Sequence, residues 1–416
     1  MITQTIQDVN FIIAAAFFLL YIYQLFFVLV PFFKKEEPHK KEVIHRFAVM
    51  ISARNESNVI AQLIASLKKQ NYPGDMFDVF VVADNCTDNT AEVARNAGAI
   101  VYERFNTEKV GKGYALDYLI GEIFKKYGKD HYDGFMVFDA DNILDANFIS
   151  AMNRTFTDGH RIITSYRNSK NYGTNWISAG YALWFLRESK YLNYSRMLMH
   201  TSCAISGTGF LVHKDIIKKN DGWKCFLLTE DIQFSIKNVI EGETIGYCND
   251  AVLYDEQPVT FSQAWTQRLR WAKGFLQVFR HHGLDLVRQL FKTGRFSCFD
   301  MTMTILPSIF LSIATCLMNV IAVTLAVCSG EDVSGLMMLA VHWCVNVYWM
   351  VFALGLITTV TERKQIHCST KKKILYMFTF PIYLLSYIPI SIVALFKQVK
   401  WEPIKHGNAS EITVED

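Results

Sequence analysis

Phe138-Asp139-Ala140-Asp141-Asn142 is the stretch on which the interpretation of this sequence depends, and the apolar run 135–138 leads into it. A short apolar run that ends in two acids is typical of a buried strand that delivers carboxylates to the carboxyl edge of a sheet. Because residues two apart share one face of a strand, Asp139 and Asp141 are expected to converge on one site. Two such oxygen ligands suit Mg²⁺ or Mn²⁺, with phosphate oxygens completing the shell. Asp and Asn also favour ordinary turns, so this stretch alone leaves both interpretations equally open.

Short apolar strands and amphipathic helices alternate on either side of this stretch. The predicted strands cover residues 47–51, 78–84, 100–102 and 135–138, and the predicted helices cover 56–70, 90–97 and 113–126. Such alternation predicts an α/β domain with a mostly parallel sheet, whose ligands bind beyond the carboxyl ends of the strands.

The turns after the first three predicted strands carry polar residues that suit a ligand site. They are 52–56 (Ser-Ala-Arg-Asn-Glu), 84–90 (Asp-Asn-Cys-Thr-Asp-Asn-Thr) and 109–113 (Lys-Val-Gly-Lys-Gly). The last of them opens a helix, where unpaired N–H groups and a lysine favour a phosphate. Each turn alone is equally well explained by ordinary turn and capping residues. Three successive turns together with the acid pair favour the ligand site.

Two further segments stand out between residues 150 and 260. Residues 206–212 (Ser-Gly-Thr-Gly-Phe-Leu-Val) place small side chains before a predicted strand, as where the backbone approaches a ligand closely. Thr229-Glu230-Asp231 begins a helical pattern after an apolar pair. Acids in a first helical turn are common, so this second segment alone indicates only the start of a helix.

Membrane segments flank the α/β pattern. Residues 11–33 are long and apolar enough to cross a bilayer, with Gln24 as the only strongly polar side chain. Lysines at 34, 35, 40 and 41 follow, which predicts an outside amino terminus and a cytosolic α/β domain. Two more spans are expected at 302–328 and 335–360. A last apolar segment, 374–396, is interrupted by two prolines, and either a crossing, which we favour slightly, or a re-entrant segment fits it.

A basic amphipathic helix with aromatic residues is predicted between residues 263 and 291, a composition that suits a membrane interface. The chain is thus expected to consist of five parts. They are a transmembrane helix at 1–34, the α/β domain at 45–260, interface helices at 261–300, a C-terminal transmembrane region at 301–397 and a tail at 398–416. The protein is expected to be a multi-pass protein of the cell membrane, in contact with its lipids.

Composition excludes several other classes of protein. A formal net charge of +3 over 416 residues gives no case for a nucleic-acid partner. The nine cysteines are scattered singly, with no Cys-x-x-Cys pair. This usage indicates reduced thiols rather than a disulfide framework or a zinc site.

Taken in order, these motifs resemble the membrane-integrated glycosyltransferases of family 2, which include the hyaluronan, chitin, cellulose and poly-N-acetylglucosamine synthases. The resemblance covers roughly residues 45–275 by motif and the remainder by layout. It rests on four motifs: Asp84, Asp139-Ala140-Asp141, Thr229-Glu230-Asp231 and Gln267-Arg268-Leu269-Arg270-Trp271. The resemblance implies a GT-A fold, a UDP-sugar donor and Mg²⁺ or Mn²⁺.

The resemblance also implies roles for individual residues. Asp84 would read the uracil base, and Asp231, next to Glu230 in the catalytic motif, would take the proton of the acceptor hydroxyl. Asp141 would hold the metal, and Asp139 would contact the nucleotide, the sugar or the metal. The remaining roles are nucleotide binding for Ala53, Glu56 and Lys112, diphosphate binding for Arg270 with Gln267, and support of the acceptor sugar for Trp271.

These roles describe direct displacement with inversion at the anomeric carbon, and they predict a processive synthase of a β-linked polysaccharide. The alternative within the same class is transfer of one sugar to a lipid-linked acceptor. A transporter or receptor that senses a nucleotide is a third hypothesis, but it leaves Asp231 and the motif at 267–271 unexplained. Two features depart from the family: the first turn lacks its usual proline, and about four spans are visible. A homo-oligomer or an accessory subunit is therefore a candidate partner in secretion.

Overall fold

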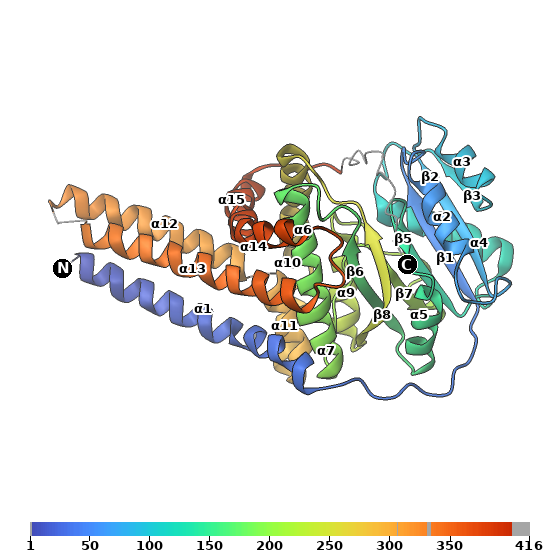
Figure 1. Cartoon of the computed structure of the whole chain (residues 1–416), viewed down its shortest axis with the longest axis horizontal. Helices are drawn as coiled ribbons and strands as arrows, with labels where there is room; N and C mark the ends of the chain where they lie inside the picture. Colours follow the sequence, from blue (N-terminus) through green and yellow to red (C-terminus); the bar gives the residue numbers. More distant parts are fainter. Residues whose placement is uncertain (1, 306, 331–333, 402–416) are drawn as a thin grey trace.

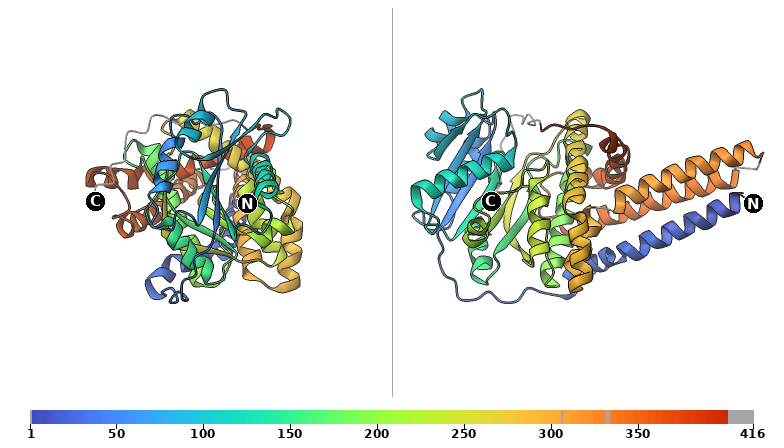
Figure 2. Two further views of the ribbon diagram at one scale, coloured as in Figure 1. Left: turned by 90° about the vertical axis from the view of Figure 1, so that its right-hand side faces the viewer. Right: turned by 180° about the vertical axis from the view of Figure 1, so that it is seen from behind.

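A computed structural model describes residues 2–305, 307–330 and 334–401. An α/β domain forms one end of the molecule, and three long helices project together from its other side (Figure 1). The view from behind shows the same arrangement (Figure 2).

The α/β domain is built on one eight-stranded sheet with the strand order β3-β2-β1-β4-β7-β6-β8-β5. The strands β3, β2, β1 and β4 are parallel, whereas β7 runs antiparallel to both of its neighbours. The predicted α/β fold with a largely parallel sheet is confirmed. The strands are β1 (Phe47–Ala53), β2 (Phe77–Asp84), β3 (Ile100–Arg104), β4 (Gly134–Asp139), β5 (Ile143–Leu144), β6 (Ile162–Ser169), β7 (Phe210–His213) and β8 (Ile245–Asp255).

Nine helices cover the two faces of this sheet in the described part of the domain. They are α2 (Ile60–Lys68), α3 (Thr90–Asn96), α4 (Lys112–Tyr127), α5 (Phe148–Thr157), α6 (Trp176–Arg187), the π-helix η1 (Glu188–Asn193), α7 (Tyr194–Leu198), α8 (Lys214–Lys219) and α9 (Glu230–Glu241). The predicted start of the first helix at Glu56 was wrong. Glu56 lies in a turn before α2, where its backbone N–H donates to Thr90 Oγ1 at 2.8 Å.

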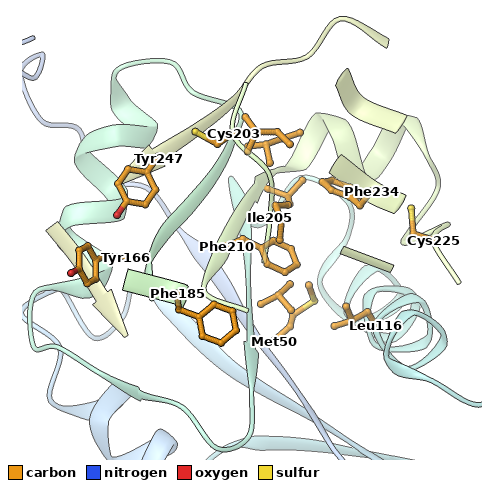
Figure 3. Packing of buried hydrophobic residues seen from close by; sticks show 14 of the residues in the cluster. Met50, Leu116, Tyr166, Phe185, Cys203, Ile205, Phe210, Cys225, Phe234 and Tyr247 are labelled. Carbon is orange, nitrogen blue, oxygen red and sulfur yellow. The ribbon is translucent and has the colours of Figure 1, made fainter. Parts of the chain in front are cut away.

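Successive residues of the central strands point to opposite faces of the sheet, so the core consists of two layers, one on each face. Met50 and Val137 face one layer, where they join residues of α4, α6 and α9, while Ile51 and Phe138 face the other, which α2 and α5 cover. Figure 3 shows part of the first layer, in which Met50, Leu116 and Phe210 meet. Because residues of both sheet halves share this layer, the carboxyl ends of β1, β2 and β4 are held on a rigid base.

The remaining helices form the membrane part and the interface. They are α1 (Ile2–Phe33), α10 (Phe261–Thr293), α11 (Phe296–Ile305), α12 (Pro307–Cys328), α13 (Ser334–Thr361), α14 (Thr370–Leu385) and α15 (Tyr387–Phe396). Among the described residues, three stretches are long and apolar enough to cross a membrane: Asp8–Phe33, Ala340–Thr361 and Thr370–Phe396. The stretch Leu317–Cys328 is apolar but shorter. The predicted span 302–328 began too early, because residues 302–305 belong to α11.

The segment predicted at 374–396 consists of two helices that meet at Ser386. Helix α14 packs against α6 and α13, and α15 packs against α10. Lys372 Nζ donates to the carbonyl of Gly173 at 2.6 Å, and beyond α15 the ring of Trp401 lies 5.2 Å from the guanidinium of Arg54. Both ends of the segment therefore contact the α/β domain. Thr370–Phe396 is nevertheless long and apolar enough to cross a membrane, so our slight preference for a crossing stays a prediction.

Candidate active site

A cavity of about 670 Å³ lies at the carboxyl ends of β1, β2 and β4, and residues of α10 line it on the opposite side. All the candidate site residues that the family resemblance implied line this cavity. They are Ala53, Glu56, Asp84, Lys112, Asp139, Asp141, Glu230, Asp231, Gln267, Arg270 and Trp271. The sheet edge brings the first six together, because parallel strands with successive strand-to-helix turns end side by side.

The acid pair sits in a turn that hydrogen bonds hold in place. Strand β4 ends at Asp139, whose backbone N–H donates to Thr208 Oγ1 at 2.9 Å. Asp141 lies beyond the strand, and its Oδ2 accepts from the backbone N–H of Glu256 at 3.0 Å. The argument that both acids share one strand face was therefore wrong in detail, since the turn and not the pleat directs Asp141 to the cavity.

Lys112, in the turn at 109–113, contacts the acid pair. It is the first residue of α4, and its Nζ donates to Asp139 Oδ1 at 2.5 Å and to the carbonyl of Gly207 at 2.7 Å. Burial alone would lower the lysine's pKa, but the nearby carboxylates, Asp139 foremost, raise it above its usual value. The next residue, Gly113, is needed for close approach, because a Cβ there would lie 2.0 Å from the carbonyl oxygen of Cys225.

Asp84 has a partner of its own. It is only 4% exposed and forms an ion pair with Arg104, whose Nη2 also donates to the carbonyl of Lys109 at 2.7 Å. Asp84 and Arg104 are opposite each other in the register of β2 and β3. A nucleoside base at this end of the cavity would therefore meet a neutralised pair rather than a lone carboxylate.

Glu230 and Asp231 are the first two residues of α9 and line the cavity. Asp231 Oδ2 accepts from the backbone N–H of Gly207 at 2.7 Å. Burial raises the pKa of Asp231, and burial together with the charge of Asp231 raises the pKa of Glu230 to about 7. A buried carboxyl with a raised pKa is suited to accepting a proton, because its conjugate acid is stable near neutral pH.

Helix α10 supplies the opposite wall. A Cβ at Gly274 would lie 2.5 Å from the Thr229 side chain, so this glycine lets α10 approach the start of α9. Among the described residues, Gln267 Oε1 is buried without a hydrogen-bond partner, as expected where a substrate would supply a donor. Trp271 packs edge-on against Tyr181, with ring centroids 5.7 Å apart.

The structure adds lining residues that the sequence analysis missed. Trp401 lies over two guanidinium groups, at 5.2 Å from Arg54 and 5.9 Å from Arg270. Arg167 donates through Nε to Asp255 Oδ2 at 2.6 Å and lies 3.7 Å from the ring centroid of Phe185. The only signal for Trp401 was an aromatic residue in a lysine-rich tail. Residues 402–416 of the predicted tail lie outside the described residues.

The cavity suits a divalent cation that arrives with its substrate. In the described part of the chain, no group of three or more His, Cys, Asp or Glu side chains is arranged to hold a metal ion. Asp139 and Asp141 nevertheless line the same cavity, and two carboxylates suffice for an ion that keeps water and takes phosphate oxygens. The donor set therefore fits Mg²⁺ or Mn²⁺ bound jointly with a diphosphate.

The sheet with an acid pair at its carboxyl edge has the GT-A-like fold that the motifs predicted. Residues 45–274 match the family described as "Glycosyltransferase like family 2", and the chain belongs to this family. The resemblance stated from the motifs is thereby confirmed.

Three curated relatives show the range of the family. The chain is 24% identical over 273 residues to "Probable glycosyltransferase YdaM" of Bacillus subtilis (60% of this chain, 59% of the relative). It is 24% identical to "Beta-monoglucosyldiacylglycerol synthase" of Nostoc sp. (66% and 60%). It is also 24% identical to "Poly-beta-1,6-N-acetyl-D-glucosamine synthase" of Staphylococcus epidermidis (58% and 60%). The matched part spans about 60% of the length of these relatives.

A solved structure shares the fold over nearly the whole chain. It is the mannosyltransferase PcManGT of Pyrobaculum calidifontis, in complex with GDP-mannose and Mn²⁺. The TM-score is 0.58 at 14% identity, over 94% of this chain and 99% of that one. The likeness therefore includes the helices outside the α/β domain.

Proposed function

We propose that this protein transfers a sugar from a UDP-sugar, with inversion, to the hydroxyl of an acceptor that reaches the cavity from the membrane. One observation carries the proposal. The motif expected to bind the nucleotide, the acid pair and the motif of the expected general base are far apart in the sequence, yet residues of all three line one cavity. The cavity continues past α10 to residues of α1, α11, α13 and α15, all outside the α/β domain.

Asp231 is the general base in this proposal. The acceptor oxygen forms a bond to the anomeric carbon, its proton passes to the Asp231 carboxylate, and the bond from that carbon to the β-phosphate oxygen breaks. An attack opposite the leaving group converts an α-linked donor into a β-linked product. The hydrogen bond from Gly207 N–H fixes one carboxylate oxygen and leaves the carboxylate oriented toward the cavity.

Lys112 and Arg270 stabilise the departing diphosphate. Both are partly buried cations that line the cavity, and preorganised charge at a leaving group lowers the barrier because it needs no reorganisation during the reaction. Asp139 and Asp141 would hold the divalent cation, which supplies further charge neutralisation when bound. Trp271 would carry the apolar face of the acceptor sugar, beside Tyr181 and Phe185.

Two acceptor classes remain candidates. Processive elongation of a β-linked polysaccharide is the prediction from the motifs, and a poly-N-acetylglucosamine synthase is among the relatives. Transfer to a lipid is favoured by apolar side chains at the far end of the cavity, among them Met303, Leu354 and Ile388. In both cases the enzyme would be a multi-pass membrane protein with the α/β domain in the cytosol.

The test uses the full chain in nanodiscs with radiolabelled UDP-sugars and with GDP-mannose for comparison. We expect release of UDP with one UDP-sugar and incorporation of label into either a long polymer or a single lipid product. Turnover of GDP-mannose alone would contradict the assignment of the donor. Absence of transfer from every nucleotide sugar would overturn the proposed function.

A further inference from the structure

Arg187, at the end of α6, is a buried cation without a carboxylate partner at the membrane side of the cavity. It is 8% exposed, and its Nη2 donates to Gln24 Oε1 at 3.2 Å. Its Nε has no hydrogen-bond partner among the described residues, and none of the carboxylates described lies within ion-pair distance. Arg187 lines the cavity together with Gln24, Tyr21, Trp184, Leu192 and Thr304.

The neighbouring arginines differ from Arg187 in this respect. Arg196 binds Asp300 through two hydrogen bonds of 2.7 and 2.9 Å, and Arg167 pairs with Asp255. Arg187 has instead a neutral amide from α1 and the ring of Trp184, at 5.2 Å from its guanidinium. A buried charge is normally paired, so an uncompensated guanidinium that faces a cavity points to an anionic ligand.

The pKa of Arg187 is consistent with a role in binding an anion. Burial lowers the pKa of Arg187 to about 10, an effect that the adjacent Glu188 reduces and Arg196 reinforces. The residue is thus still a cation at neutral pH. Glu188 is a weak counter-ion, because burial raises its pKa and its Oε2 already accepts from Ser206 Oγ at 3.3 Å.

The local backbone is also unusual. The π-helix η1 begins directly after Arg187 and widens the turn that carries Glu188. Such turns are rare and are often found at functional sites. Gln24, a polar residue of the apolar α1 span, is the residue that reaches Arg187, so this helix contributes to this end of the cavity.

We propose that Arg187 binds the phosphate of an acceptor lipid, so that the sugar is transferred to a phosphate-bearing lipid rather than to a neutral lipid or a polysaccharide. The guanidinium fork recognises phosphate oxygens through two parallel hydrogen bonds, and Arg187 brings to this end of the cavity a guanidinium whose Nε has no hydrogen-bond partner among the described residues. The membrane helices around this end give the acyl chains a place to lie. The proposal rests on the proposed function for the reaction, but its binding site can be tested without turnover.

The experiment measures lipid binding to the full chain in detergent without nucleotide sugar, by native mass spectrometry. The probes are dioleoylphosphatidic acid, dioleoylglycerol with the same acyl chains, and inorganic phosphate. We expect phosphatidic acid to bind at least tenfold more tightly than dioleoylglycerol, and Arg187→Gln to abolish this preference. Arg187→Lys should keep part of it. The matched control is Arg288→Gln, an exposed arginine of α10 that pairs with Asp285.

A second variant covers the case in which Arg187→Gln fails to fold. Gln24→Glu keeps the shape of the side chain and gives Arg187 an internal carboxylate, so it should weaken phosphatidic acid binding about tenfold while raising the melting temperature. Equal binding of dioleoylglycerol and phosphatidic acid would overturn the proposal, as would unchanged binding in both variants. Equally tight binding of inorganic phosphate would overturn the lipid assignment. UDP release measured in parallel reports on the transferase reaction separately.

Discussion

The assignment of Asp231 as the general base can be tested by Asp231→Asn. The substitution removes the proton acceptor but keeps the shape of the side chain, and the Asn Oδ1 can still accept from the backbone N–H of Gly207. General-base catalysis contributes about 10²- to 10⁴-fold to rate, which corresponds to about 3 to 5 kcal/mol of transition-state stabilisation. We expect kcat to fall by at least about 100-fold, with the KM for the UDP-sugar within threefold, because no nucleotide contact is lost.

The assay is UDP release by the full chain in nanodiscs, with thermal unfolding measured in parallel. Folding should not suffer, because the variant removes the charge that, after burial, contributes most to the raised pKa of the adjacent Glu230. The matched control is Asp117→Asn, which makes the same change on α4 at a carboxylate that accepts from Trp223 N–H at 2.9 Å. A variant Asp231→Asn that folds and keeps a third or more of wild-type kcat would refute the assignment of the base.

Three further predictions follow from the site. Trp401→Ala removes the ring that lies over two arginines, and we expect the KM for the UDP-sugar to rise about fivefold, for a loss of about 1 kcal/mol, with a smaller effect on kcat. Complete chelation by EDTA should abolish UDP release and Mn²⁺ or Mg²⁺ should restore it; activity in the presence of EDTA would contradict the metal role of Asp141. Because burial raises the pKa of Asp231, kcat should increase with pH up to a value above that of an ordinary aspartate, and an acid limb at the usual aspartate pKa would contradict this.

The parallel half of the domain was predictable because each element is encoded locally. The short apolar runs in Phe77–Asp84 and Gly134–Asp139 and the helical periodicity of α4 do not depend on distant contacts. The other half of the sheet, which contains both parallel and antiparallel pairs, was less predictable. Its strand β7 is only four residues long, and antiparallel pairing with both β4 and β6 determines its position.

The same distinction holds for the site. Residues in strand-end turns, such as Asp84 and Lys112, could be found because their motif fixes their place in the fold. Interactions that depend on register or on remote segments could not, as the ion pair of Asp84 with Arg104 and the ring of Trp401 over Arg54 show. Gln24 was noticed as a polar residue in an apolar span, but its partner Arg187 became visible only when α1 and α6 were placed together.

The position of Trp401 also bears on membrane topology. If Thr370–Phe396 crossed the bilayer, Trp401 would lie on the side opposite to the α/β domain and could not contact Arg54. If α14 and α15 lay at the interface instead, the lysines at 397 and 400 would lie on the same side as Arg363 and Lys364, which the charge rule favours. Pro389 lies in the first turn of α15, where a proline is tolerated, whereas Pro381 lies inside α14 and does not end that helix. The contact of Trp401 with Arg54 therefore favours the re-entrant segment that the sequence left open as the alternative, and it makes Trp401 part of the cavity wall.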